Sequence, residues 1–259
     1  MKTVKKHGNS GGVYVPSSWI GGKVKVDLVD EPANPKKDIL EKISLEHVIS
    51  VILYGSYVRK EMEKESDIDI LLVTDEKIKI SIPSEIKKKY DIQVKSLTVL
   101  KNAMMHDPVF YKTIKDDAVA IINQNLLDDI RKEPAPINKI EERLKMIESS
   151  LSISKEIIEL DYTQAGELVY PIIMRLREAL ILECLLDVKK YSTQYLKKEI
   201  SRKGISAKEL SLLISIYRST RSGKKIPIYD ISIDTITKLI LILEERVRYV
   251  REKTRKKRN

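Results

Sequence analysis

The fold is decided by two segments, Val48-Ile-Ser-Val-Ile-Leu-Tyr-Gly-Ser56 and Ser66-Asp-Ile-Asp-Ile-Leu-Leu-Val73. Each contains a short apolar, β-branched run of the kind that predicts a buried strand, and Gly55-Ser56 ends the first of them. Because successive side chains of a strand point to opposite faces, Asp67 and Asp69 are expected on the same face. The two segments therefore predict neighbouring strands with a pair of carboxylates at the start of the second.

The carboxylate pair indicates a metal site. Two carboxylates this close repel each other unless a cation lies between them, and Mg²⁺ prefers oxygen ligands, usually one or two carboxylates together with substrate phosphates. Gly55 removes the side chain at the end of the first strand, so that phosphate oxygens can approach backbone N–H groups and the Ser56 hydroxyl. Arg59 is expected to reach the same phosphates from a helix-compatible segment over 57–64. These features together predict metal-assisted phosphoryl or nucleotidyl transfer.

A third carboxylate belongs to the segment Tyr90-Asp-Ile-Gln-Val94, which reads as a strand after a helix over 84–90. If this strand pairs beside the strand of Asp67, Asp91 lies near the carboxylate pair. There it would bind a second metal ion or accept the proton of an attacking hydroxyl.

The string Gly55-Ser-Tyr-Val-Arg-Lys60, followed by Ser66-Asp-Ile-Asp69, resembles the Gly-Ser-x-Ala-Arg-Gly…Ser-Asp-Ile-Asp pattern of minimal nucleotidyltransferases in the DNA polymerase β-like superfamily. The resemblance covers roughly residues 38–123. It implies transfer of a nucleoside monophosphate from an NTP, with ATP the expected donor, to a hydroxyl or phosphate acceptor, with two Mg²⁺ ions and release of pyrophosphate; a hydroxyl acceptor is expected here. Lys60 departs from the pattern, which usually has Gly at this position.

The same resemblance assigns roles to individual residues. It implies that the catalytic, metal-binding carboxylates are Asp67, Asp69 and Asp91. It implies that the NTP is bound by Gly55, Ser56 and Arg59.

The N-terminal segment alternates and is rich in glycine. Strands are expected over 2–7, 13–16 and 23–29, with a turn over 8–12 and one helical turn over 17–20. About 30 residues bury too little apolar surface to fold alone, so intertwining with a second copy is expected. The string Lys6-His-Gly-Asn-Ser-Gly-Gly-Val-Tyr-Val-Pro16 resembles the Gly-Asn-Ser-x-Gly-Val-x-x-Pro pattern of swapped-hairpin, AbrB-like domains.

That resemblance implies an interleaved homodimer that binds duplex DNA. The residues that it would place near the phosphate backbone are Lys5, Lys6, His7, Asn9 and Ser10. The alternative is a hairpin that only dimerises and whose lysines are solvated.

The C-terminal part follows the breaker-rich segment Glu133-Pro-Ala-Pro136 and reads as five helices, over 140–158, 161–187 with a kink at Pro171, 191–200, 206–217 and 236–250. The layout resembles the HEPN or substrate-binding bundles found beside minimal nucleotidyltransferases. HEPN ribonucleases carry an Arg and a His at a short spacing, but here Arg221 is followed by Pro227 and Tyr229 without the His. A ribonuclease site is therefore not expected, and the bundle is expected to shape the acceptor pocket or a partner surface.

Charge is unevenly distributed along the chain of 259 residues, whose net charge is +10. Residues 1–37 carry 7 Lys or Arg against 3 Asp or Glu, residues 38–133 carry 15 against 18, and residues 134–259 carry 26 against 17. A catalytic middle that is net negative suits bound Mg²⁺, and the basic flanks are where a nucleic acid would bind. The cations of the basic C-terminal tail have a second explanation, since positive charge stabilises the C-terminal end of a helix.

The fold class expected is therefore α+β and multidomain: a β swapped-hairpin over 1–30, a linker over 31–37, an α/β nucleotidyltransferase core with a mixed sheet over 38–132, and an all-α bundle with a basic tail over 133–259. No apolar run is long enough to span a membrane, the N-terminus has no apolar signal region, and a single cysteine excludes an internal disulfide framework. A cytoplasmic protein is expected. The alternative function is a DNA-binding regulator, or an antitoxin of a toxin-like partner protein, whose transferase fold is sensory or degenerate.

Overall fold

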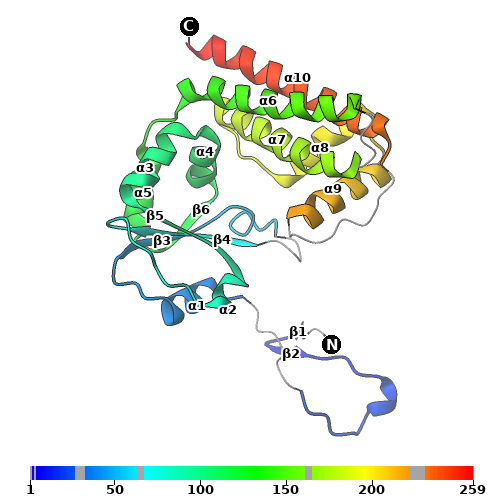
Figure 1. Ribbon diagram of the computed structural model, residues 1–259. Coiled ribbons are helices and arrows are strands. Elements are labelled where there is room, and N and C mark those ends of the chain that lie inside the picture. The colour runs from blue at the N-terminus through cyan, green and yellow to red at the C-terminus, as the bar shows by residue number, and fades with distance from the viewer. Residues whose placement is uncertain are drawn as a thin grey trace. The chain divides into compact units, whose positions relative to one another are not determined.

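The computed structural model describes residues 2, 4–26, 33–62, 67–160, 165–221 and 231–258, and Figure 1 shows its elements. The chain forms two compact units, Met1–Asn34 and Pro35–Asn259. Among the helices of the described residues, none combines the length and apolar character that a bilayer-spanning segment requires.

The larger unit is built on a four-stranded mixed sheet of β3 (Val48–Tyr54), β4 (Ile68–Thr74), β5 (Tyr90–Ser96) and β6 (Ala118–Ile122). The strand order is β5-β4-β3-β6, with β3 antiparallel to both neighbours and β4 parallel to β5. The strands expected from the two decisive segments and from Tyr90 onward are confirmed, as is the mixed character of the sheet. An α+β fold of this kind is compatible with a nucleotidyltransferase core.

Strand alternation gives the sheet two apolar faces. Val51, Ile70 and Leu72 belong to a small core packed with α1 (Pro35–Lys42) and α2 (Ser84–Lys87). In Figure 1 these two helices lie on the opposite side of the sheet from the other helices of the larger unit. The alternate residues of the same strands, among them Leu71 and Val73, belong to a larger core on that other face. Asp69 lies two residues before Leu71 on β4, so both side chains point to the same face of the sheet. The candidate site therefore lies on the face that the larger set of helices covers.

Three helices next to the sheet begin at side-chain caps. They are α3 (Leu97–His106), α4 (Pro108–Asp116) and α5 (Gln124–Lys132). The Asp107 carboxylate accepts the N–H groups of Val109 and Phe110 at 2.9 and 3.1 Å, and Pro108 occupies the first turn, where a missing N–H costs nothing. The caps of α3 and α5 fix where the chain leaves β5 and β6 and turns into a helix, and the Asp107 cap fixes where α4 begins after α3.

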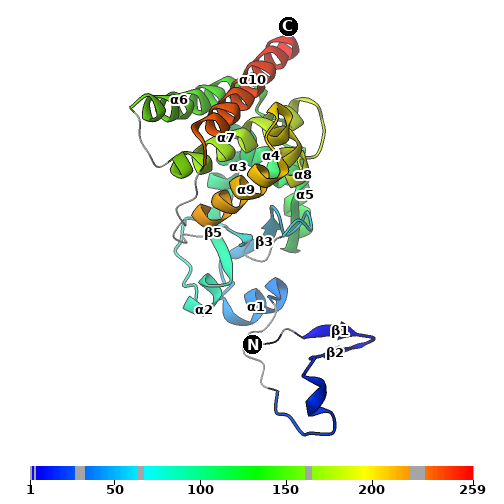
Figure 2. The ribbon, with the colours of Figure 1, turned by 90° about the vertical axis from the view of Figure 1, so that its right-hand side faces the viewer.

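The five expected helices of the C-terminal part are present. They are α6 (Ile140–Glu159), α7 (Ala165–Leu186), α8 (Thr193–Ile200), α9 (Ala207–Arg221) and α10 (Ile233–Arg258). Pro171 lies inside α7, whose expected first residues over 161–164 are outside the described part of the chain. Figure 2 shows α6 and α10 on the side away from the sheet, with α7 between them and the sheet.

The sheet and the helical bundle share one apolar interior. Ile52 and Leu71 of the sheet belong to the same buried cluster as Leu144 of α6, Leu176 of α7 and Leu243 of α10. The boundary expected at residues 132 and 133 therefore falls inside a continuous core, within a unit that runs from Pro35 to Asn259.

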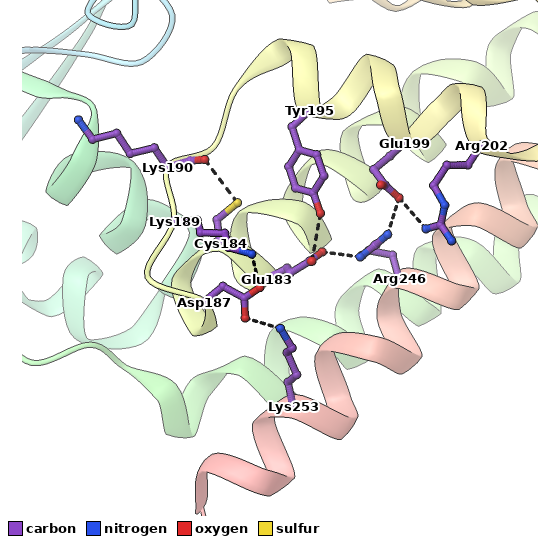
Figure 3. Close-up of polar contacts among 10 residues, drawn as sticks. All are labelled: Glu183, Cys184, Asp187, Lys189, Lys190, Tyr195, Glu199, Arg202, Arg246 and Lys253. Carbon is purple, nitrogen blue, oxygen red and sulfur yellow. Dashed lines mark hydrogen bonds and ion pairs between the residues drawn. The ribbon is translucent and has the colours of Figure 1, made fainter.

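A buried ionic network holds α10 to α7 and α8 (Figure 3). The guanidinium of Arg246 donates to Glu183 at 2.6 Å and also to Glu199, and Tyr195 donates to Glu183 at 3.0 Å. Three further cations of the basic tail contact α6 or the end of α7: Arg251 bonds Glu141 and Glu148 of α6, Lys253 bonds Asp187 just after α7, and Lys257 bonds the Leu186 carbonyl. These tail cations are thus engaged in holding the bundle together.

The smaller unit contains a short antiparallel hairpin of β1 (Lys5–His7) and β2 (Ser10–Gly12), with Gly8 in the turn at φ +58°. The strand expected over 13–16 does not form, and residues 23–26 are not a strand either; 27–29 lie outside the described residues. An isolated strand has no partner for its N–H and C=O groups. Tyr14, Trp19 and Ile20 are exposed, and no described residue of this unit is buried. The described residues of one copy of this unit therefore enclose no interior.

Candidate active site

Three polar side chains form a row across the sheet. Asp69 on β4 is directly paired with Asp91 on β5 and with Tyr54 on β3. The parallel pairing of β4 with β5 therefore brings Asp91 beside Asp69, as the sequence predicted. Asp67 lies two residues before Asp69, just ahead of the strand, and is exposed, as is Asp91.

The Asp69 carboxyl is more enclosed than those of Asp67 and Asp91, with 15% of its side chain exposed. Burial raises its pKa, and the negative charges of Asp91 and Asp67 raise it further, whereas Arg221 and Arg177 act in the opposite direction. The net pKa is above the ordinary value for an aspartate. A cation bound beside Asp69 would remove this electrostatic cost.

Gly55 directly follows the last residue of β3 and lies against the Asp69 carboxylate. Its φ is +80°, and a Cβ at this position would lie 2.6 Å from the Asp69 Oδ2 atom. Its N–H donates to the Asp117 carbonyl at 2.9 Å. Gly55 therefore contributes to the site mainly through the side chain that it lacks, because its N–H is already bonded within the fold.

The Ser56 hydroxyl begins the next turn. Its Oγ atom is buried, and within the described residues it has no hydrogen-bond partner. A buried hydroxyl without a partner is costly unless a ligand or a water satisfies it. Ser56 is thus a candidate donor to a phosphate oxygen.

The segment after Ser56 forms hydrogen-bonded turns rather than the expected helix. The Arg59 N–H donates to the Gly55 carbonyl and the Glu61 N–H to the Ser56 carbonyl, at 3.2 and 3.0 Å, and no helix forms up to residue 62. Lys60 has φ +58°, in the left-handed region that favours glycine. This explains why the family pattern has Gly where this chain has Lys; residues 63–66 lie outside the described part.

Arg59 lies beside the site, but its guanidinium is held by the protein. It bonds Asp117 at 2.7 Å and Glu61 at 2.9 Å, and it lies over the ring of Tyr191 with 5.4 Å to the centroid. The sequence singled out none of these three partners. A direct contact of Arg59 with a phosphate stays a prediction, whereas its role in holding the turn is evident from these bonds.

Glu61 joins the turn to the bundle. Its carboxylate accepts the backbone N–H of Thr193 at 3.1 Å and the Thr193 hydroxyl at 3.0 Å, at the first residue of α8. Burial alone would raise the pKa of Glu61, but the hydrogen bonds from Arg59 and Thr193 outweigh it and lower the pKa. The nucleotide-binding turn expected from the sequence is therefore fastened to a helix of the C-terminal part.

Two cations of the bundle also face the carboxylates. The Arg221 Nη2 atom, at the end of α9, lies 3.9 Å from Asp69 Oδ1. Arg177 on α7 lies against Tyr191 and Tyr217 and within electrostatic range of Asp69. The sequence drew attention to Arg221 only in connection with a ribonuclease motif, whose further positions Pro227 and Tyr229 are outside the described residues.

The candidate site fits a hard cation in its donor chemistry. No group of three His, Cys, Asp or Glu side chains in the described ranges is arranged to hold a metal ion. Asp67 and Asp69 nevertheless supply the carboxylate oxygens that Mg²⁺ prefers when substrate phosphates complete its coordination. The space left by Gly55 beside Asp69 and the unpartnered Ser56 hydroxyl lie at the same end of the sheet.

The candidate DNA-binding residues lie in the smaller unit, on or next to its hairpin. All five are exposed: Lys5, Lys6, His7, Asn9 and Ser10. The Ser10 hydroxyl donates to the His7 carbonyl at 3.0 Å, which closes the turn. The Lys5 ammonium lies over the Tyr14 ring with 5.9 Å to the centroid.

Comparison with known proteins agrees with this geometry. Residues 36–162 match the family model described as a nucleotidyltransferase domain. Over 81 residues the chain is 37% identical to the "Putative protein adenylyltransferase MJ0141" of Methanocaldococcus jannaschii, covering 31% of this chain and 76% of that protein. Over 88 residues it is 32% identical to the "Putative protein adenylyltransferase MJ0126" of the same organism, covering 33% of this chain and 86% of that protein.

Proposed function

Because the chain belongs to the nucleotidyltransferase-domain family, we propose that it transfers a nucleoside monophosphate from an NTP to a hydroxyl acceptor with Mg²⁺ as its cofactor. The observation that carries the proposal is the pairing of Asp69 with Asp91, next to a glycine that leaves room beside the Asp69 carboxylate. Asp67 and Asp69 would hold the metal, and Asp91 would be the third carboxylate.

In this reaction the acceptor oxygen attacks the α-phosphorus of the NTP. A new P–O bond forms, the bond from the α-phosphorus to the oxygen that bridges it to the β-phosphorus breaks, and pyrophosphate leaves with that bonding pair. The proton of the acceptor hydroxyl passes to the Asp91 carboxylate. Bound Mg²⁺ would neutralise charge on the phosphates. Ser56 would donate its hydroxyl to a phosphate oxygen, and Arg59 would hold the turn that carries it.

The expected donor is ATP and the expected acceptor is a hydroxyl on a protein. Both relatives in Methanocaldococcus jannaschii bear names that describe them as protein adenylyltransferases, and the chain covers most of their length. Their names support AMP as the transferred group and a protein side chain as its acceptor. A toxin-like partner protein is one such acceptor, and a nucleic-acid end or a small molecule would be an alternative outcome of the labelling test.

The test is incubation of the protein with Mg²⁺, α-³²P-labelled ATP and cell extract, followed by identification of what is labelled. Asp69→Asn should reduce labelling at least about 100-fold, because it removes charge stabilisation from the transition state. Asp75→Asn is the matched control, since Asp75 is exposed just beyond the other end of β4. Equal labelling by wild type and Asp69→Asn would refute the assignment.

A second function, binding of duplex DNA by a homodimer, is favoured by the smaller unit. Its hairpin exposes Lys5 and Lys6, and none of its described apolar side chains, Trp19 among them, is buried in one copy. A second copy would cover those side chains, and DNA phosphates would neutralise the lysines.

The double variant Lys5→Glu/Lys6→Glu should lose most of its affinity for DNA, together with the dependence of that affinity on salt. The control is Lys77→Glu/Lys79→Glu, which makes the same charge change at exposed positions of the larger unit and should keep its DNA affinity. Sedimentation velocity of the intact chain tests the homodimer. DNA affinity that is equal in both double variants would remove this function.

A further inference from the structure

Two arginines from the helical bundle lie within electrostatic range of Asp69. Arg221, the last residue of α9, places Nη2 3.9 Å from Asp69 Oδ1, with 36% of its side chain exposed. Arg177, in the middle of α7, interacts with the Asp69 charge. Both are more than a hundred positions further along the chain than Asp69. The shared core between sheet and bundle is what brings them there.

Arg177 is held in position by aromatic side chains. Its guanidinium lies 6.0 Å from the centroid of the Tyr191 ring and hydrogen-bonds to Tyr217. The Tyr217 ring stacks on Tyr170 with 5.5 Å between centroids and 21° between planes. A guanidinium fixed against aromatic faces loses little conformational entropy when it binds an oxyanion.

Arg59, a further cation near the site, already has partners within the protein. Arg59 is bonded to both Asp117 and Glu61. Arg221, by contrast, is beyond hydrogen-bond distance from Asp69, and Asp69 is the carboxylate proposed to hold the metal. A metal ion at Asp69 would compete with Arg221 for the same negative charge.

We propose that Arg221 and Arg177 form an anion clamp, that is, a pair of guanidinium groups that binds the triphosphate of the NTP. When the metal–nucleotide complex binds, Arg221 leaves Asp69 and contacts the phosphates instead. This inference rests on the proposed nucleotidyl transfer. In the absence of nucleotide, the positive charge of Arg221 offsets the negative charge of Asp69. With nucleotide bound, the clamp offsets the charge of the departing pyrophosphate, for which paired guanidinium groups are well suited.

If Arg221 moves from Asp69 to the phosphates in this way, replacing it should change metal affinity and nucleotide affinity in opposite directions. Arg221→Gln removes the cation that competes with the metal, so Mn²⁺ alone should bind the full-length protein about 3- to 10-fold more tightly, as expected for loss of one nearby like charge. The same variant should bind the Mn²⁺ complex of α,β-methylene-ATP at least about 10-fold more weakly, because a charge-assisted phosphate contact is lost. Electron paramagnetic resonance measures free Mn²⁺, and calorimetry measures the nucleotide complex.

Lys208→Gln is the matched control, since Lys208 is an exposed cation of the same helix near its other end. It should change neither affinity. Arg177→Lys should retain Mn²⁺ affinity but weaken binding of the nucleotide complex, because Lys cannot make the planar contacts of a guanidinium.

The outcomes separate the clamp from the function on which it rests. If wild type binds the nucleotide complex and Arg221→Gln binds it equally well, the clamp is wrong and nucleotidyl transfer stands. If Arg221→Gln weakens Mn²⁺ and the nucleotide complex alike, Arg221 only supports the fold and its move from Asp69 to the phosphates is wrong. If wild type binds no nucleotide complex, the proposed function is wrong and the clamp with it.

Discussion

Gly55 and Asp69 lie so close that a methyl group on residue 55 would stand 2.6 Å from the Asp69 Oδ2 atom. The end of one strand thus determines the space around the carboxylate on the next. The site therefore depends on the absence of a Cβ atom at residue 55 as much as on the Asp69 carboxylate itself.

Gly55→Ala should damage the site through that contact. The left-handed φ of +80° adds strain, about 1 to 2 kcal/mol for a non-glycine residue, and the new methyl group displaces the Asp69 carboxylate. Gly204→Ala is the matched control, because Gly204 has φ +73° but nothing within 4 Å of the added Cβ. The free energy of unfolding in urea should fall in both variants, and by at least as much in Gly55→Ala as in Gly204→Ala, but only Gly55→Ala should lose ATP-dependent labelling. Retained labelling in both would contradict the role given to this contact.

Lys60→Gly should stabilise the protein. Lys60 is exposed and has φ +58°, so its side chain suffers strain that glycine avoids. The expected gain is about 0.5 to 1 kcal/mol, after the greater entropy of glycine in the unfolded chain is subtracted.

The control for Lys60 is Lys88→Gly, at an exposed lysine whose φ is −74°. There the same change should destabilise the protein by about 0.5 to 1 kcal/mol, because no strain is relieved. Urea unfolding measures both variants. The explanation from backbone strain fails if the two shifts have the same sign.

Thr193→Val should loosen the turn that holds Ser56. The hydroxyl of Thr193 donates to the Glu61 carboxylate at 3.0 Å, and valine keeps the shape of threonine while removing this donor. The expected loss is about 1 kcal/mol, at the low end for a hydrogen bond to a charged group because Glu61 is partly exposed. Thr237→Val, at an exposed hydroxyl within α10, should cost less. Nucleotide affinity should fall in Thr193→Val alone, and equal affinities would show that the turn does not depend on this bond.

Glu61 should make the stability depend on pH. Burial acts to raise its pKa, but the hydrogen bonds from Arg59 and Thr193 prevail and lower it below the usual 4.5. The stabilisation from Glu61 is therefore fully present above pH 4.5 and is lost as the pH falls through the lowered pKa. Between pH 5 and 3, the free energy of unfolding should fall less steeply in Glu61→Gln than in wild type. Glu46→Gln, at an exposed position, should keep the wild-type slope, and a wild-type slope in Glu61→Gln as well would exclude this contribution.

Arg246→Met should be among the most destabilising charge removals in the bundle. Arg246 is 8% exposed and bonds both Glu183 and Glu199, so its loss leaves the buried Glu183 carboxylate without this cation and leaves Glu199 with the half-exposed Arg202 (Figure 3). The expected cost is about 3 to 5 kcal/mol. Arg248→Met, at an exposed position of the same helix, should change stability by less than about 0.5 kcal/mol. Thermal unfolding of both compares them, and a similar shift in the two would argue against the importance of the buried network.

The placement of Asp69 and Asp91 on neighbouring strands was predictable from the sequence because its signals are local. Strand alternation around Asp67 and Asp69 is read from consecutive residues, and a short helix followed by another strand makes parallel pairing of Asp91 plausible. The five helices of the bundle were equally accessible, since their apolar residues recur at helical spacing.

The surroundings of the row were not predictable in this way. Arg59 and Asp117 are 58 positions apart, and Glu61 and Thr193 are 132 positions apart. Such bonds form because a common apolar core aligns distant segments, and no local pattern encodes them. The strand expected over 13–16 failed for a related reason, since a strand needs a partner that one copy of the hairpin does not provide.

The continuous interior from Ile52 of the sheet to Leu243 of α10 has a consequence for how such a chain can diversify. A helical module with its own core can be exchanged between proteins as a cassette. Here every exchange would have to match the side-chain volumes on the sheet face as well, because close-packed interiors tolerate little mismatch. Sheet and bundle are thus expected to change together during evolution, with substitutions on one side compensated on the other.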